Sequence, residues 1–184
     1  VTLDLSSYFD NCKFIAMTGA QLILDPSATG QFNKGSAQFI GCQFFGCTNM
    51  WKGIRVDGVS ASFYGGKIQD ALYGIHSANL GDIVVSGVDF SHNFIGVYMT
   101  SNPSHSFAGN KFAGGTLKPK YNGYPNFANK NFAGIYAQGV TISEDGNPNW
   151  GCAFLTVGDN GGAPNTFNNL QNGIIHNGGF ATRV

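Results

Sequence analysis

Apolar residues recur along this chain in a unit of six positions: an apolar residue, any residue, Gly or Asn, any two residues, and a second apolar residue. Clear copies start at residues 9, 39, 63, 85 and 107, which are separated by 30, 24, 22 and 22 positions. No window of a dozen residues shows the period of an amphipathic helix. The pattern therefore predicts short strands joined by turns, repeated about every 22 residues.

A second marker, Gly followed by Ile or Val, occurs once in each unit. In two undisturbed units and in the last one, this Gly comes six residues after the second apolar residue of the six-position unit. A period near 22 is shorter than that of a propeller blade and lacks the Leu-rich pattern of horseshoe repeats, but it suits a coil of three short strands. The marker pairs are Gly53-Ile54, Gly74-Ile75, Gly96-Val97, Gly134-Ile135 and Gly173-Ile174.

Because side chains alternate between the two faces of a strand, the apolar positions of successive coils should stack inside in three columns. The repeated glycines should serve either a positive φ or a close backbone approach. We predict an all-β, right-handed parallel β-helix of six to seven coils. It forms a single domain over residues 1–184 that is part of a longer chain. The predicted columns are Phe39, Phe63, Val85 and Phe107; Phe44, Ile68, Phe90, Phe112 and Phe167; and Ile54, Ile75, Val97, Ile135 and Ile174.

These units resemble the right-handed parallel β-helix repeats of secreted bacterial proteins. The segment CTNMWKGIRV at 47–56 is similar to segments of large secreted or surface proteins of Bacteroidetes-type bacteria. The resemblance implies an extracellular or cell-surface location. It does not choose among activities, because this fold includes polysaccharide lyases, hydrolases, adhesins and tailspikes.

The composition of the chain excludes several classes of binding partner. Lys and Arg together number 10, as do Asp and Glu, and only 11% of residues are charged. A neutral chain lacks the basic surface that binds nucleic acid. No run of 18 apolar residues is present, so we expect no membrane-spanning segment. The opening residues VTLDLSSYFDNC lack the basic and apolar regions of a signal peptide, so we expect none within this stretch. The four Cys have no CxxC spacing, so we expect no metal, and we expect no cofactor.

Two insertions interrupt the repeat, at about 114–130 and 143–165. They carry Tyr121, Tyr124 and Trp150, which are candidates for a sugar-binding platform because loops on a rigid scaffold often carry function. The alternative is that these rings cover the side of the solenoid and pack against it.

One position after each marker pair should point outward. Read along the coils, it contains Arg55, His76, Tyr98, Tyr136 and Ile175. We expect these residues to form one exposed column at about 4.8 Å spacing. The first four are candidate ligand-binding residues, since Tyr offers a sugar both an apolar ring face and a hydroxyl. The alternative is cross-strand stacking that only stabilises the sheet.

Asp70 and His92 occupy equivalent positions, two residues after Ile68 and Phe90, and should be neighbours on adjacent coils. They are weak catalytic candidates for proton abstraction, and a hydrogen bond at a corner of the coil is the alternative. Cys12 and Cys42 also share a repeat position, so they are a possible disulfide or two free thiols. Asn49, Asn93 and Asn172 are candidates for an internal amide ladder.

The leading hypothesis is a non-catalytic module of an exported protein, either structural or glycan-binding and adhesive. Its partners would be polysaccharide or other domains of the same protein. The first alternative is a polysaccharide lyase or glycoside hydrolase of the β-helix fold. The second is a fibre-forming structural subunit.

Overall fold

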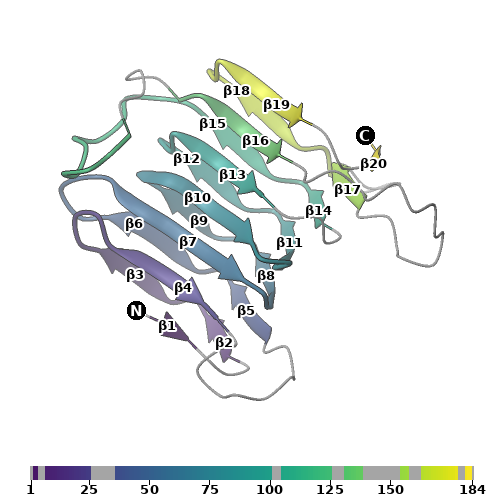
Figure 1. Cartoon of the computed structure of the whole chain (residues 1–184), viewed down its shortest axis with the longest axis horizontal. Coiled ribbons are helices and arrows are strands. Elements are labelled where there is room, and N and C mark those ends of the chain that lie inside the picture. The colour runs from purple at the N-terminus through teal and green to yellow at the C-terminus, as the bar shows by residue number, and fades with distance from the viewer. Residues whose placement is uncertain are drawn as a thin grey trace.

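The computed structural model of the chain consists of short strands that stack in parallel (Figure 1). Its described residues form twenty strands and no helix, so none of them forms a helix that could cross a membrane. The structure describes residues 2–3, 7–25, 36–100, 105–125, 131–138, 154–157, 163–177 and 181–183.

The strands belong to three sheets, and the pairings between the described strands are all parallel. The first sheet contains β1 (Thr2–Leu3), β4 (Gln21–Leu24), β7 (Trp51–Asp57), β10 (Ala71–Ala78), β13 (Ile95–Met99), β16 (Ala133–Gln138) and β19 (Asn172–Asn177). The second contains β2 (Ser7–Asp10), β5 (Ser36–Ile40), β8 (Ser60–Tyr64), β11 (Asp82–Ser86), β14 (His105–Ala108), β17 (Phe154–Val157) and β20 (Ala181–Arg183). The third contains β3 (Lys13–Ala16), β6 (Gln43–Gly46), β9 (Lys67–Gln69), β12 (Asp89–Ser91), β15 (Lys111–Ala113) and β18 (Thr166–Asn168).

The chain visits the three sheets in turn, so each strand pairs with the strand three places further along the chain. Successive rungs lie side by side from the purple N-terminal end to the yellow C-terminal end in Figure 1. This arrangement is consistent with a parallel β-solenoid. Strand β17 falls inside the range predicted as the second insertion, 143–165, so four residues of that range form a regular rung of the second sheet.

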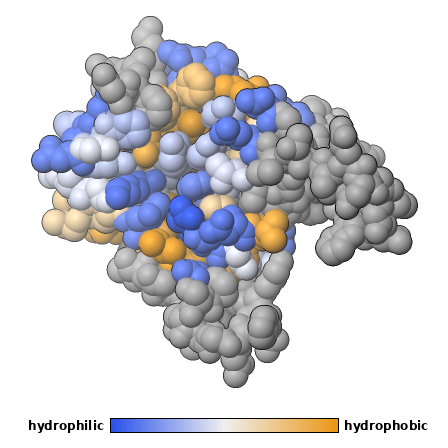
Figure 2. All heavy atoms as spheres, viewed as in Figure 1, coloured by the Kyte–Doolittle hydropathy of each residue, from blue (hydrophilic) through white to orange (hydrophobic). Residues whose placement is uncertain are grey.

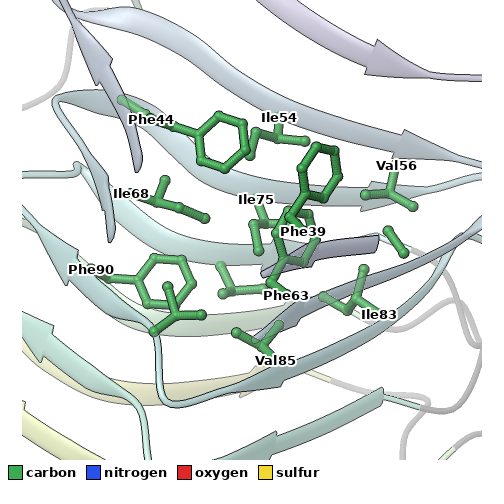
Figure 3. Packing of buried hydrophobic residues seen from close by; sticks show 14 of the residues in the cluster. Phe39, Phe44, Ile54, Val56, Phe63, Ile68, Ile75, Ile83, Val85 and Phe90 are labelled. Carbon is green, nitrogen blue, oxygen red and sulfur yellow. The ribbon is translucent and has the colours of Figure 1, made fainter. Parts of the chain in front are cut away.

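The three predicted apolar columns are confirmed by the strand register. Ile75 pairs with both Ile54 and Val97, and Phe63 pairs with both Phe39 and Val85. These side chains converge between the sheets in Figure 3 and are almost completely buried. Burying each of them contributes roughly 1.5–3 kcal/mol. The columns extend one rung further toward the N-terminus than predicted, to Phe9, Phe14 and Leu22.

Where Phe follows Phe in a column, the rings stack face to face. The centroids of Phe90 and Phe112 are 4.7 Å apart, and those of Phe112 and Phe167 are 5.0 Å apart. Their interplanar angles are 8° and 4°. The spacing between rungs of a parallel sheet is about 4.8 Å, close to these separations. Strand pairing and ring stacking therefore share one repeat distance.

The repeated glycines serve two different needs. In the six-position unit, Gly41, Gly65, Gly87 and Gly109 have φ values of 61°, 64°, 68° and 66°, which L side chains rarely adopt. These glycines form the turn that leads from the second sheet to the third.

The marker glycines Gly74, Gly96 and Gly134 instead lie inside strands of the first sheet, where an added Cβ would come too close to a neighbouring atom. A Cβ on Gly96 would lie 2.6 Å from the carbonyl oxygen of Gly134 and 2.7 Å from the ring of Phe112. Only Gly53 among the marker glycines has a positive φ, at 100°. Close approach therefore explains most of the second marker.

Buried asparagines hold the turns together. Asn93 Oδ1 accepts from Ala71 N at 2.9 Å, and Asn93 Nδ2 donates to Ile68 O at 2.8 Å. On the next rung, Asn131 Nδ2 donates to Asn93 O at 2.6 Å. The predicted ladder is therefore correct for Asn93, with Asn131 as its neighbour.

The other two predicted ladder positions have different roles. Asn49 donates to Lys120 O at 3.3 Å and Asn172 donates to Phe132 O at 3.1 Å, so neither continues the ladder of Asn93. A second ladder that the sequence analysis missed joins Asn110 and Asn165 at 2.9 Å.

The surface is mixed rather than uniformly polar. Figure 2 shows hydrophilic side chains spread over the middle of the face in view, with smaller hydrophobic groups around them. Tyr8, Ile15 and Met17 near the N-terminal end are 61%, 61% and 71% exposed.

The marker glycines give a stability prediction. Gly96→Ala should lower the free energy of unfolding by about 1–3 kcal/mol, because the added Cβ overlaps Gly134 O and the Phe112 ring. Gly173→Ala is the matched control, since a Cβ there meets Phe167 at 3.4 Å or more. Urea unfolding followed by circular dichroism measures both. Equal losses for the two variants would contradict close packing as the reason for the marker.

Candidate functional site

The predicted outer column exists on the first sheet. Arg55 pairs with His76, His76 with Tyr98, Tyr98 with Tyr136, and Tyr136 with Ile175. The order is as predicted, but all five residues are half-buried rather than fully exposed. Neighbouring long side chains on adjacent rungs cover one another, and this reduces the exposure of each.

The rings in this column pack against each other. The ring centroids of His76 and Tyr98 lie 5.0 Å apart with an interplanar angle of 27°, and those of Tyr98 and Tyr136 lie 5.4 Å apart at 45°. A sugar stacks on the face of an aromatic ring. Because neighbouring rings pack against one another, less of each ring face is open to a sugar.

Tyr73 joins this group although the sequence analysis did not select it. Its ring centroid lies 4.8 Å from that of Tyr98 and 5.5 Å from that of His76. Strict alternation from Ile75 would place Tyr73 inside the solenoid. The pairing with β7 shifts between Tyr73 and Ile75, however, and Tyr73 packs in a second hydrophobic cluster outside the main core. No signal in the sequence marks that shift apart from the glycine between them.

Polar groups line the downstream ends of these strands. Arg55 Nε lies 2.8 Å from Asp57 Oδ2, and Asn79 Nδ2 donates to the other oxygen of that carboxylate. His76 Nε2 lies 3.2 Å from Thr100 Oγ1, and Tyr98 OH donates to Gln138 Oε1 at 2.8 Å. Each of these polar groups therefore already has a partner within the protein.

His76 is neutral at physiological pH. Its pKa is lowered from 6.5 to about 4, chiefly by burial; the nearby Arg55 charge contributes to the decrease and Asp57 opposes it. Burial also raises the pKa values of the Tyr73 and Tyr98 hydroxyls, so both stay protonated. The column is therefore a hydrogen-bonding aromatic surface and not a titrating one.

The described part of the first insertion, residues 114–125, forms a strap against the upstream ends of these strands. Tyr121 is only 8% exposed and packs with Met50, Leu72, Phe94 and Ala133 in the second hydrophobic cluster. Backbone bonds tie the strap down, since Met50 N donates to Pro119 O at 2.9 Å.

The Tyr residues of this strap pack inward rather than forming a platform. The Tyr124 ring meets Tyr121 edge-on at 5.3 Å, Tyr124 is half-buried, and burial raises the pKa of its hydroxyl. The packing alternative is thus correct for Tyr121 and fits Tyr124. Trp150 lies outside the described residues.

Asp70 and His92 are neighbours at a corner of the coil, as predicted. Both have left-handed backbone conformations, with φ of 63° and 55°, and Asp70 Oδ1 lies 3.9 Å from His92 Nδ1. Asp70 is 1% exposed, and its Oδ2 accepts from Gln69 Nε2 at 3.1 Å.

Lys118 of the strap is the partner that the sequence analysis missed. Its Nζ lies 2.9 Å from Asp70 Oδ2 and also donates to the carbonyls of Gly46 and Cys47, at 2.6 Å and 3.1 Å. Lys118 reaches Asp70, which lies 48 residues earlier in the sequence, only because the strap folds back over that coil. The spacing of the repeats does not predict this course of the chain. A buried carboxylate that already pairs with an ammonium group is poorly placed to act as a general base.

Gly115, which His92 contacts, also lines a shallow hollow. The hollow has a volume of about 340 Å³ and is lined by Gly115, Asn131, Asn169, Leu170 and Gln171. His92 contacts the backbone at Gly115, where an added Cβ would lie 2.7 Å from Nε2. The amide of Asn131 is already bonded within the protein, to Gly115 N and Asn93 O.

Cys12, Cys42 and Cys47 are free thiols in the structure, so the possible disulfide is not formed in it. Among the parts of the chain that the structure describes, no group of three His, Cys, Asp or Glu side chains could hold a metal ion. Comparison with protein-family models, with curated proteins and with solved structures finds no match to this chain.

The Lys118 contacts give a prediction for the strap. Lys118→Met leaves the Asp70 carboxylate buried without its cation and should cost about 1–2 kcal/mol, a moderate value because the Lys118 side chain is 31% exposed. Chymotrypsin should then cleave after Tyr121 faster than in the unmodified protein. Lys111→Met, at an exposed position of β15, is the control and should change neither readout. Unchanged cleavage in Lys118→Met would mean that the hydrophobic contacts alone hold the strap.

The lowered pKa of His76 predicts a pH dependence. Above pH 6.5 the side chain is neutral in both the folded and unfolded states. As the pH falls from 6.5 to about 4, the unfolded chain gains a proton at His76 that the folded protein does not, so stability falls by about 2–3 kcal/mol. His76→Phe keeps a ring beside Tyr98 and should lose this share of the pH dependence. Urea unfolding at several pH values measures the difference, and parallel curves for the two proteins would contradict the burial of His76.

Proposed function

We propose that this chain is a non-catalytic module of a secreted or cell-surface protein and that its role is structural. One observation carries the proposal: the side chains that could do chemistry are engaged in holding the solenoid together. Asp70 is buried and paired with Lys118, Arg55 is paired with Asp57, and His76 is stacked on Tyr98. Such groups stabilise a scaffold and leave little free to act on a substrate.

The winding forms the second part of the proposal. We infer a right-handed coil of about 22 residues in undisturbed units and six to seven coils in all. The register supports this length, since Phe63 pairs with Val85 and Val85 with Phe107. Parallel crossover connections are right-handed in about 98% of cases, which favours that hand.

The location and origin rest on the sequence. A low content of charge and a surface built from Gly, Asn, Ser and Thr support an extracellular or cell-surface setting. The resemblance of segment 47–56 supports an origin among large secreted proteins of Bacteroidetes-type bacteria. The proposed partners are other domains of the same exported protein.

Glycan binding by the outer column is the second candidate. It is favoured by the Tyr98–Gln138 pair, which places a hydroxyl and an amide together at an exposed position on β13 and β16 of the first sheet. Tyr136 extends the same surface by one rung. The stacking of the rings on one another weakens this candidate, because it leaves less ring face for a sugar.

The enzymatic and fibre-forming alternatives have less support. A lyase or hydrolase would need Asp70 or His92 as a base or acid, and Asp70 lies beneath the strap with its charge compensated. A fibre-forming subunit would stack through the outermost strands of the sheets, and electron microscopy of the purified chain would show its filaments.

A paired experiment separates these functions. Tyr98→Ala and Tyr136→Ala should each lower the free energy of unfolding by about 1–2 kcal/mol, because each removes ring contacts. The unmodified protein should bind no sugar on a glycan array. If the unmodified protein bound a glycan on the array and neither variant did, glycan binding would replace the structural role as the proposed function. Release of unsaturated or reducing ends from pectin or alginate, lost in His92→Ala, would instead establish an enzyme.

A further inference from the structure

Two cysteines from consecutive coils lie one above the other at the same turn. On one side of this turn Asp10 pairs with Ile40, and on the other side Lys13 pairs with Gln43. Backbone bonds continue the alignment through the turn, from Asn11 N to Ile40 O at 2.8 Å and from Gln43 N to Cys12 O at 2.9 Å. Cys12 is therefore in register with Cys42.

This register sets their separation. Equivalent residues on adjacent rungs of a parallel sheet lie about 4.8 Å apart. Cα atoms joined by a disulfide usually lie about 4.4–6.8 Å apart. The backbone thus already holds the two cysteines within bonding range, and only a small adjustment of the side chains is needed.

The two thiols also lie close to each other. Both donate weakly to carbonyls of the same turn: Cys12 Sγ to Asp10 O at 3.3 Å, and Cys42 Sγ to Phe9 O at 3.5 Å. Burial raises the pKa of the Cys42 thiol, and the neighbouring Cys12 thiol adds to this increase. Cys12 is half-exposed whereas Cys42 is 3% exposed, so a reagent from solvent reaches Cys12 first.

We propose that Cys12 and Cys42 form a disulfide that locks the first described coil onto the second when the protein meets a small disulfide oxidant. The Cys12 thiolate attacks a sulfur of oxidised glutathione, and one glutathione thiolate leaves. The Cys42 thiolate then attacks the Cys12 sulfur of this mixed disulfide and releases the second glutathione. Overall, two protein thiols are oxidised to one disulfide while one oxidised glutathione is reduced to two thiols.

The position of this bond suits it to stabilise the N-terminal end of the described solenoid. Phe9 and Phe14, in the strands on either side of Cys12, pack on the core but are only partly buried, because they belong to the outermost rung. A covalent link from this rung to the next restrains this end of the described solenoid. It does so without a new contact in the core.

The experiment uses the full chain with Cys47→Ser and Cys152→Ser, so that only the two thiols in question remain. Circular dichroism in reducing buffer first shows that this protein is folded. Incubation with oxidised glutathione should then remove both free thiols, lower the mass by two hydrogen atoms and give a peptide pair linked through Cys12 and Cys42. Oxidation should be faster at higher pH, since the Cys42 thiolate is scarce near neutrality.

The same protein reports the consequence of the bond. The oxidised form should unfold at a temperature several degrees above that of the reduced form, with slower hydrogen exchange in β2 and β3. A matched variant that also carries Cys12→Ser should show neither change. A stable mixed disulfide on Cys12, or two thiols that still react with iodoacetamide after oxidation, would overturn the proposal.

Discussion

The structure depends on one constraint: each residue of a parallel rung lies about 4.8 Å from its equivalent on the next rung, so each position must tolerate a near copy of itself. Phenylalanine satisfies this condition by face-to-face stacking, as Phe90 and Phe112 show. Glycine satisfies it by close backbone approach at Gly96 and Gly134. Asparagine satisfies it because its side-chain amide bonds two backbone groups of the preceding rung, as Asn93 does with Ala71 N and Ile68 O.

The same constraint accounts for the low charge. Like charges directly opposite each other on neighbouring strands are destabilising. Lys67 of the third sheet has Gln43 on one side and Asp89 on the other, and Asp89 is followed by Lys111. In this row, a neutral residue or a residue of opposite charge always stands between two residues of like charge. A chain in which most positions repeat this way has room for few charges, and only 11% of its residues carry one.

Repetition also explains which features the sequence predicted. The columns through Ile75 and Phe63 follow from spacing alone, because each rung restates the same pattern. Lys118, Tyr73 and the Asn110–Asn165 ladder did not follow from it. Lys118 lies on a strap with no repeat of its own, Tyr73 lies at a shift in pairing, and Asn165 lies at the end of the range predicted as the second insertion. Residues that occur once, outside the repeat, produce no periodic pattern in the sequence. Their contacts are therefore visible only in the structure.

The constraint finally bears on chemistry. A catalytic or binding site requires unlike groups at fixed positions, whereas stacking favours like groups at equivalent ones. Asp70 and His92 break the repetition at one corner, and this is also where the strap adds a cation and buries the carboxylate. The unlike pair at this corner is therefore stabilised by a contact with the strap, and the carboxylate is not exposed to solvent. Corners and straps, where the repetition relaxes, are therefore the places at which a solenoid of this kind can acquire a site, and in this chain the described corner is used to hold the strap in place.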